Sequence, residues 1–286
     1  DKIKFFFRKL IPSIFSSGVT QINILVGTII ASFQAGAVSY LYYADRVYQI
    51  NLAVAGIAVG TVMLPELSKH VKNNNSDLIT NLQNRALELC LFLSIPAGTA
   101  LVIASEEIVT SLFGYGSFDY KSVNNTAIAL TFFAFGVPAF SILKIFSNFF
   151  FARNNTKLPF YLSVISVILN ILISVLFFGK LGFVIIPIAT SISSWINVIL
   201  HFYFIKKQNL HDFDRTFIYK FPRIIFSTIV MGIILYFTLG FLSDKFNYNE
   251  SWKIVYLFII VSVSLLIYFF VSNFSGAFKL KDIKLR

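Results

Sequence analysis

The sequence predicts an all-α polytopic membrane protein with about eight transmembrane helices, and three observations lead to this fold class. Hydrophobic residues make up 57% of the 286 residues and charged residues only 13%, whereas soluble domains carry about 25% charged residues. The apolar residues fall in runs of about 20, the length that crosses a hydrocarbon core. Lysine and arginine are alternately abundant and scarce in the connections between these runs, which is the pattern of cytoplasmic and external loops.

Hydropathy defines eight candidate spans in chain order. They cover residues 10–33, 38–67, 86–113, 126–151, 159–178, 183–204, 222–242 and 252–274. Most connections are short, and the two longer ones, 68–85 and 206–221, are polar and are expected to lie on a surface. Spans seven and eight are apolar almost all round, so we expect them to face lipid at the periphery of any polar cavity.

Basic residues divide unequally between the two sides of the predicted bundle. Of the 24 lysines and arginines, 18 fall on the side of the two termini, four fall on the opposite side, and Arg46 and Lys144 lie within spans. Because cytoplasmic loops carry the excess, both ends of the chain are predicted to be cytoplasmic. The formal charge of +11 then sets the topology and meets anionic lipid head groups, and nucleic acid is not a predicted partner.

We expect no cleavable signal peptide at the start of this sequence, because residues 1–9 are rich in charge and the first span begins late. The chain opens on Asp1 rather than Met, and we expect it to be a fragment of a longer protein. Cys90 is the only cysteine, so neither an internal disulfide nor a thiolate metal site is predicted.

The second span carries charge inside an apolar run. Asp45 and Arg46 are adjacent there, and a charge at such depth costs about 2–3 kcal/mol or more, so it usually faces a protein interior or a water-filled cavity. Arg46 and Gln49 share one helix face with Gly56 and Gly60. The polar half of this face is a candidate anion site, and the two glycines would let a neighbouring helix approach closely. Asp45 lies about 100° away around the helix, so it needs a partner of its own.

An alternative arrangement takes the Arg46 side chain out to the membrane surface. Arg46 lies only about 12 Å from the outer end of its span, where Tyr40, Tyr42 and Tyr43 are grouped. A guanidinium on a long apolar stem can reach the interface from that depth. The sequence leaves both arrangements open.

Polar residues recur at helical spacing in other spans. Asn23 lies in such a stripe of the first span, and it is a candidate cavity residue because its helix directly precedes that of Arg46. Lys144 is the second cation within a span, with the alternative that its stem reaches the cytoplasmic interface. The stripes around Asn170 and Asn197 are expected to be helix contacts more often than ligand sites, because amides and hydroxyls bond across membrane helices.

Three prolines fall inside predicted spans. Pro96, Pro138 and Pro187 lie in spans three, four and six. Proline removes a backbone donor and kinks a helix, which membranes tolerate where neighbours or water satisfy the freed carbonyl. These prolines are candidate gating kinks, with static proline-containing helices as the alternative.

The sequence lacks the signature motifs of several classes of enzyme. No G-x-x-x-x-G-K-[ST] motif is present to cradle nucleotide phosphates. The three histidines are too scattered for a zinc site. The adjacent carboxylates Glu106 and Glu107 fall near the outer loop at the end of span three, so no carboxylate pair is expected deep within a span. A protein that binds or moves an anion without covalent chemistry is therefore favoured over a membrane prenyl-transfer enzyme.

Four motifs resemble those of the MurJ (MviN) lipid II flippases. They are YYADRVYQ at residues 42–49, AVGTVMLPELS at 58–68, LFGYGSF at 112–118 and FARNNTK at 151–157. The resemblance extends over essentially the whole chain. It implies membership of the multidrug/oligosaccharidyl-lipid/polysaccharide exporter superfamily. The architecture that the resemblance implies is two six-helix lobes and two extra helices. On that map, residues 1–206 would be the second lobe, and 207–286 would be a cytoplasmic connector, two accessory helices and a basic tail.

The resemblance also implies a substrate, a partner and a place. Lipid II, an undecaprenyl-diphosphate-linked disaccharide-pentapeptide, would move outward across the bacterial inner membrane for peptidoglycan synthesis, by alternating access between this lobe and an absent N-terminal lobe. The motif arginine that would meet the diphosphate maps to Arg46. No cofactor is implied, and coupling to a monovalent ion or to the membrane potential is expected without an assigned site.

Two further functions stay open at this stage. One is another exporter of the same superfamily, which carries a different lipid-linked sugar or a drug. The other is a membrane scaffold within a cell-wall assembly that transports nothing.

Overall fold

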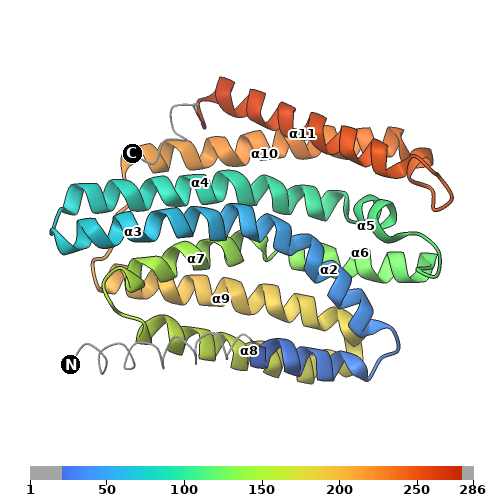
Figure 1. Cartoon of the computed structure of the whole chain (residues 1–286), viewed down its shortest axis with the longest axis horizontal. Coiled ribbons are helices and arrows are strands. Elements are labelled where there is room, and N and C mark those ends of the chain that lie inside the picture. Colours follow the sequence, from blue (N-terminus) through green and yellow to red (C-terminus); the bar gives the residue numbers. More distant parts are fainter. Residues whose placement is uncertain (1–20, 279–286) are drawn as a thin grey trace.

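The computed structural model describes residues 21–278 (Figure 1). All regular elements in this range are helices, which confirms the predicted fold class. They begin with a helix over Gln21–Ser32. They continue as α2 Ala37–Leu52, π-helical η1 Ala53–Ala58, α3 Val59–Lys72, α4 Ser76–Ile103, α5 Ser105–Phe113, α6 Tyr120–Ala134, α7 Val137–Phe151, α8 Lys157–Leu181, the short η2 Gly182–Val184, α9 Ile185–Lys207, α10 Arg215–Phe241, η3 Ser243–Phe246 and α11 Lys253–Ser275.

The long helices run side by side along the longest axis of the molecule, so their connections gather at two ends (Figure 1). We call these the basic end and the opposite end. The basic end contains the junctions 72–76, 151–157 and 207–215, and the opposite end contains 33–37, 113–120, 181–185 and 241–253. Most described lysines and arginines lie in or near the junctions of the basic end, as the alternation in the sequence predicts.

Counted by helix length and hydropathy, the described residues contain fewer membrane spans than the eight that the sequence predicts. Among residues 21–278, five segments are long and apolar enough to cross a membrane, or six when α6 and α7 count as one bent span. One of the five, Lys157–Lys207, contains both α8 and α9. The helix Gln21–Ser32 is apolar but shorter, and the start of the first predicted span lies outside the described residues. Eight spans therefore stays a prediction.

Helices α8 and α9 form a hairpin held by the polar stripes of the fifth and sixth predicted spans. The hydroxyl of Ser166 donates to the carbonyl of Ser193 at 3.0 Å, and the amide of Asn170 donates to the hydroxyl of Thr190 at 3.0 Å. From Ser166 to Asn170 the residue number rises on α8, while on α9 it falls from Ser193 to Thr190, so the two helices are antiparallel. In this hairpin the polar stripe residues make helix contacts.

The polar stretch 68–85, predicted as a surface connection, is almost entirely helical. Only residues 73–75 separate α3 from α4. Asn75 caps α4 by accepting a hydrogen bond from the backbone N–H of Leu78 at 3.4 Å, and Asp214 caps α10 in the same manner within the second polar connection. Hydropathy marks where a helix enters the bilayer, whereas capping side chains decide where it begins.

The three prolines lie in different local settings. Pro96 lies within α4, which is unbroken from Ser76 to Ile103. Pro138 is the second residue of α7 and directly follows a 41° bend between α6 and α7. Pro187 is the third residue of α9, in the first turn, where proline is accommodated without a kink. A gating role stays a prediction, and Pro187 marks a helix start rather than a kink inside a span.

The break between α6 and α7 exposes backbone carbonyls that α9 satisfies. The hydroxyl of Ser191 donates to the carbonyl of Phe132 at 2.6 Å, and the indole N–H of Trp195 donates to the carbonyl of Phe135 at 3.0 Å. Unpaired backbone groups at membrane depth cost several kcal/mol, so a broken span needs such partners. The close approach depends on Gly136, because a Cβ there would lie 2.7 Å from the Ser191 hydroxyl oxygen.

Candidate functional site: a cationic face on α2

The buried face of α2 fixes which residues remain open to the outside. Ala37, Tyr40, Ala44 and Val47 are buried and follow one another at helical spacing, so they form the packing face. The intervening positions include Arg46, which is exposed. The packing face of α2 is therefore apolar, and Arg46 lies outside that face. The continuous segment Ala37–Lys72, which begins with α2, is still apolar enough to cross a membrane.

The Arg46 guanidinium lies over an aromatic ring. Its central carbon is 4.7 Å from the centroid of the Tyr42 ring, one turn earlier on α2. Tyr42 is itself 54% exposed, so the pair stands on an open face. This contact is compatible with both arrangements of Arg46 that the sequence leaves open, and the described residues do not enclose the guanidinium. The two best-defined pockets within residues 21–278 do not include it.

Asp45 has a partner of its own. Its carboxylate accepts a hydrogen bond from the side-chain amide of Gln49, one turn later. None of the ion pairs found between residues 21 and 278 joins Asp45 to Arg46. Among residues 21–278 the structure therefore places Asp45, Arg46 and Gln49 on one helix, and no carboxylate there forms an ion pair with the guanidinium.

The glycine half of the face packs directly on α7. A Cβ on Gly56 would lie 3.1 Å from the Cα of Ser141 and 3.4 Å from the Lys144 side chain. One turn later, the amide of Asn148 donates to the carbonyl of Gly60 at 2.8 Å. Gly56 lies in the π-helical segment η1, and such segments are frequent at functional sites. The spacing of the glycines indicated the close packing, but it did not indicate the π-helix.

Lys144 and Asn23 occupy two different settings. Lys144 is exposed on α7 beside η1, so it lies on the helix that packs against the glycine half of the Arg46 face. Asn23 is half-buried on the helix that precedes α2, and its side-chain oxygen has no hydrogen-bond partner among the described residues. The structure thus brings Lys144 to the glycine half of the face, and no contact found among residues 21–278 joins Lys144 or Asn23 to Arg46.

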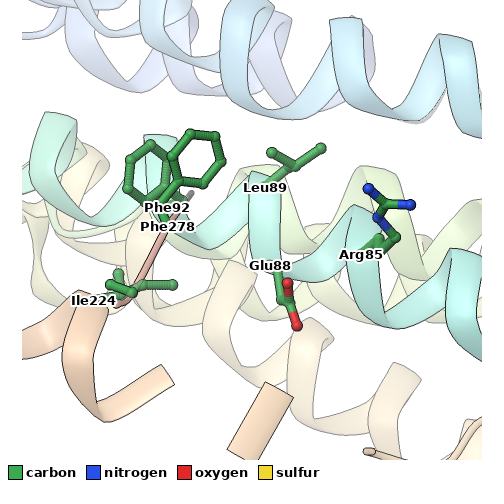
Figure 2. A pocket seen from close by; sticks show the side chains of 7 residues that line it. Arg85, Glu88, Leu89, Phe92, Ile224 and Phe278 are labelled. Atoms are coloured by element: carbon green, nitrogen blue, oxygen red, sulfur yellow. The ribbon is translucent and has the colours of Figure 1, made fainter. Parts of the chain in front are cut away.

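The two defined pockets lie elsewhere, toward the basic end. A small one, about 10 Å³, lies between α4, α10 and residues 277–278 and has room for about one water. Figure 2 shows Phe278 beside Phe92 at its wall, and the two rings stack with centroids 4.2 Å apart. Next to it the ammonium of Lys220 pairs with the Glu88 carboxylate at 2.8 Å. These contacts fasten α10 to α4.

The larger pocket, about 310 Å³, is an open groove lined only by apolar side chains. Its wall on α10 carries Phe217 and Phe221, whose rings stack with centroids 6.1 Å apart. Phe217 and Phe221 lie in the connection 206–221, which is predicted to be a polar surface segment, and no periodicity in the sequence pointed to this groove.

The comparisons with known proteins agree with the architecture. The model of the family "Lipid II flippase MurJ" matches residues 1–257 of the chain. The chain belongs to the lipid II flippase MurJ family. A probable lipid II flippase MurJ of Rhizobium meliloti is 36% identical over 276 residues, covering 96% of this chain and 52% of that protein. The corresponding protein of Rickettsia prowazekii is 34% identical over 275 residues, covering 85% and 54%.

Solved structures extend the comparison to the fold. A lipid II flippase MurJ in an inward closed conformation has a TM-score of 0.78 at 28% identity, covering 95% of this chain and 54% of that one. An outward-facing multidrug resistance MATE transporter of the MOP superfamily has a TM-score of 0.59 at 15% identity, which shows a shared fold alone. The chain spans about half the length of the MurJ relatives it matches. It is therefore a multi-pass bacterial membrane protein of a transporter family.

Proposed function

We propose that this chain is one half of a lipid II flippase and that α2 contributes Arg46 to the site for the substrate diphosphate. The substrate is undecaprenyl-diphosphate-linked disaccharide-pentapeptide, carried from the cytoplasmic to the periplasmic leaflet of the bacterial inner membrane for peptidoglycan synthesis. The observation that carries the proposal is an exposed guanidinium on α2 that forms no ion pair within the described part of the chain, in a chain that belongs to the MurJ family.

The chemistry of the face suits a diphosphate. A guanidinium is permanently charged and offers paired N–H donors that match phosphate oxygens. Asp45 accepts a hydrogen bond from the amide of Gln49, and it forms none of the ion pairs found among residues 21–278. The Tyr42 ring lies 4.7 Å from the central carbon of the guanidinium and supports the cation on that side. Lys144 adds a second exposed cation on the neighbouring α7, and Asn23 adds an amide on the helix before α2.

Transport in this proposal involves no covalent step and no cofactor. Residues 1–206 act as the second lobe, and 207–286 supply the connector, the accessory hairpin and a basic tail. The missing N-terminal lobe closes the open face of α2, and rocking of the two lobes around a midplane site exposes the substrate to each leaflet in turn. Both ends of the chain lie in the cytoplasm. A monovalent ion or the membrane potential drives the cycle, without an assigned site.

The test uses this chain joined to the N-terminal half of its Rhizobium meliloti relative in a bacterium depleted of its own flippase. We expect the unmodified fusion to restore growth and Arg46→Ala to lose at least about tenfold in transport rate, since a charged hydrogen-bond partner is removed. Arg46→Lys should retain part of the rate because it keeps the charge but not the paired donors. Lys207→Ala, an exposed cation on α9, is the matched control.

Two outcomes would contradict the proposal. Full growth with Arg46→Ala at normal protein levels would remove Arg46 from the substrate site. An unmodified fusion that reaches normal protein levels but leaves lipid II inside the depleted cells, and that moves a different lipid-linked sugar instead, would favour another exporter of the superfamily.

A further inference from the structure

Lys253, the first residue of α11, is a buried cation at the opposite end of the bundle. It is only 1% exposed. Its ammonium donates to the carbonyl of Gly114 at 2.7 Å and to the carbonyl of Tyr248 at 2.6 Å. None of the ion pairs within the described residues involves Lys253, so carbonyl dipoles take the place of a carboxylate.

Two tyrosine rings complete the surroundings of this ammonium. The nitrogen lies 4.0 Å from the centroid of the Tyr115 ring and 5.0 Å from that of the Tyr248 ring, and aromatic faces attract a cation at such distances. The Tyr248 hydroxyl also donates to the carbonyl of Phe118 at 3.0 Å. A buried charge is stable only when its surroundings are arranged this fully, so the contacts select one position of α11 relative to residues 113–118.

The same short segment contacts α2 on its other side. The ring of Tyr43 lies 4.8 Å from that of Phe113 and 5.1 Å from that of Phe118, centroid to centroid. Tyr43 is three residues before Arg46 on α2. Residues 113–118 therefore lie between the start of α11 and the turn of α2 that carries the cationic face.

We propose that residues 113–118 couple the C-terminal hairpin, α10 and α11, to α2, with Lys253 as the positioning residue of the junction. The hairpin and α2 then keep one relative position at this end of the bundle. The significance of this coupling for transport rests on the proposed function, because α2 carries Arg46. The coupling itself is a property of this chain and is measurable without substrate.

The test labels α2 and α11 and measures the distance between them. The full chain, with Cys90→Ala to remove its only cysteine, carries spin labels at the exposed positions Ser39 and Phe258. In lipid nanodiscs we expect one narrow distance distribution, and a distribution at least about twice as wide for Lys253→Met, which fills the space but donates nothing. Lys245→Met is the control, because Lys245 also lies near a tyrosine ring, at 5.8 Å, but is exposed.

Hydrogen exchange gives an independent reading of the same junction. The amides of Tyr115 and Phe118 form turn hydrogen bonds within the segment, and we expect them to exchange about tenfold faster in Lys253→Met, since two charge-assisted bonds are lost. Tyr43→Leu tests the other side and should widen the distance distribution while it leaves Lys253 in place.

An unchanged distribution and unchanged exchange in Lys253→Met, in a chain that unfolds normally, would overturn the coupling. So would a Tyr43→Leu variant whose label distances match those of the parent chain. Neither result bears on whether Arg46 contacts a diphosphate, so failure of the coupling and failure of the proposed function are distinguishable.

Discussion

At the scale of single residues, small side chains decide how close the helices come. The four-residue spacing of Gly56 and Gly60 predicted a close helix contact, and both glycines do lie against α7. The sequence did not indicate which helix they would meet. Their partners, Ser141 and Asn148, are more than 80 residues later in the chain. Both lie on α7, and the orientation of α7 depends on the rest of the bundle.

Substitution of Gly56 tests this contact. In Gly56→Ala the added methyl group would lie 3.1 Å from the backbone Cα of Ser141, so α7 must move. We expect a loss of about 1–3 kcal/mol in unfolding free energy, measured by thermal or denaturant unfolding in detergent. Gly240→Ala is the control, because nothing lies within 4 Å of its position. An alanine in place of glycine favours the helix backbone, so Gly240→Ala should not lose stability, and equal losses at both sites would contradict a packing origin.

At the scale of elements, the bent pair α6–α7 is the clearest departure from a regular span. The sequence placed one span over 126–151 with Pro138 inside it. The structure divides this span at residues 135–136 and turns it by 41°. Proline accounts for the missing donor, but the break persists because α9 supplies Ser191 and Trp195 to the exposed carbonyls.

Removal of the Ser191 hydroxyl should loosen this break. We expect Ser191→Ala to lower the unfolding free energy by about 0.5–1.5 kcal/mol and to speed amide exchange over residues 133–137. Ser163→Ala is the matched control, since its hydroxyl donates only to a carbonyl of its own helix, that of Pro159, at 2.8 Å. A break that exchanges no faster in Ser191→Ala than in the control would contradict this role for α9.

At the scale of the whole molecule, the C-terminal hairpin is attached at both ends of the bundle. Lys253 fastens the opposite end. At the basic end the connector between α9 and α10 lies between α4 and the end of α7. The amide of Asn84 donates to the carbonyl of Asp212 at 3.0 Å, and the guanidinium of Arg153 donates to the carbonyl of Leu210 at 3.0 Å. The FARNNTK motif thus contributes Arg153 as a contact to the connector.

This attachment at the basic end should weaken in acid. His211 in the connector is buried, its ring nitrogen lies 3.1 Å from the side-chain oxygen of Gln83, and burial together with nearby Lys206 lowers its pKa from 6.5 to about 4. Between these two values the unfolded chain binds a proton that the folded chain does not. Stability is therefore fully present above about pH 6.5 and falls as the pH approaches 4, by about 3 kcal/mol in total.

Unfolding titrations between pH 7 and pH 4.5 measure this slope. His211→Gln keeps a polar partner for Gln83 but has no proton to bind, so we expect a shallower fall in the midpoint. His70, which is only half-buried on α3, provides the control substitution His70→Gln. If His211→Gln and the parent chain lose stability in parallel, the connector is not the acid-sensitive element.

The sequence by itself determined the membrane class, the approximate position of the helices, the family and the candidate cation Arg46. These follow from hydropathy, periodicity and motifs, all of which are properties of neighbouring residues. Only the tertiary structure decided that Lys253 binds a carbonyl 139 positions away and that Asn148 of α7 donates to the carbonyl of Gly60, 88 positions earlier. Side chains so distant in sequence meet only through helix packing, and hydropathy carries no information about which helices become neighbours.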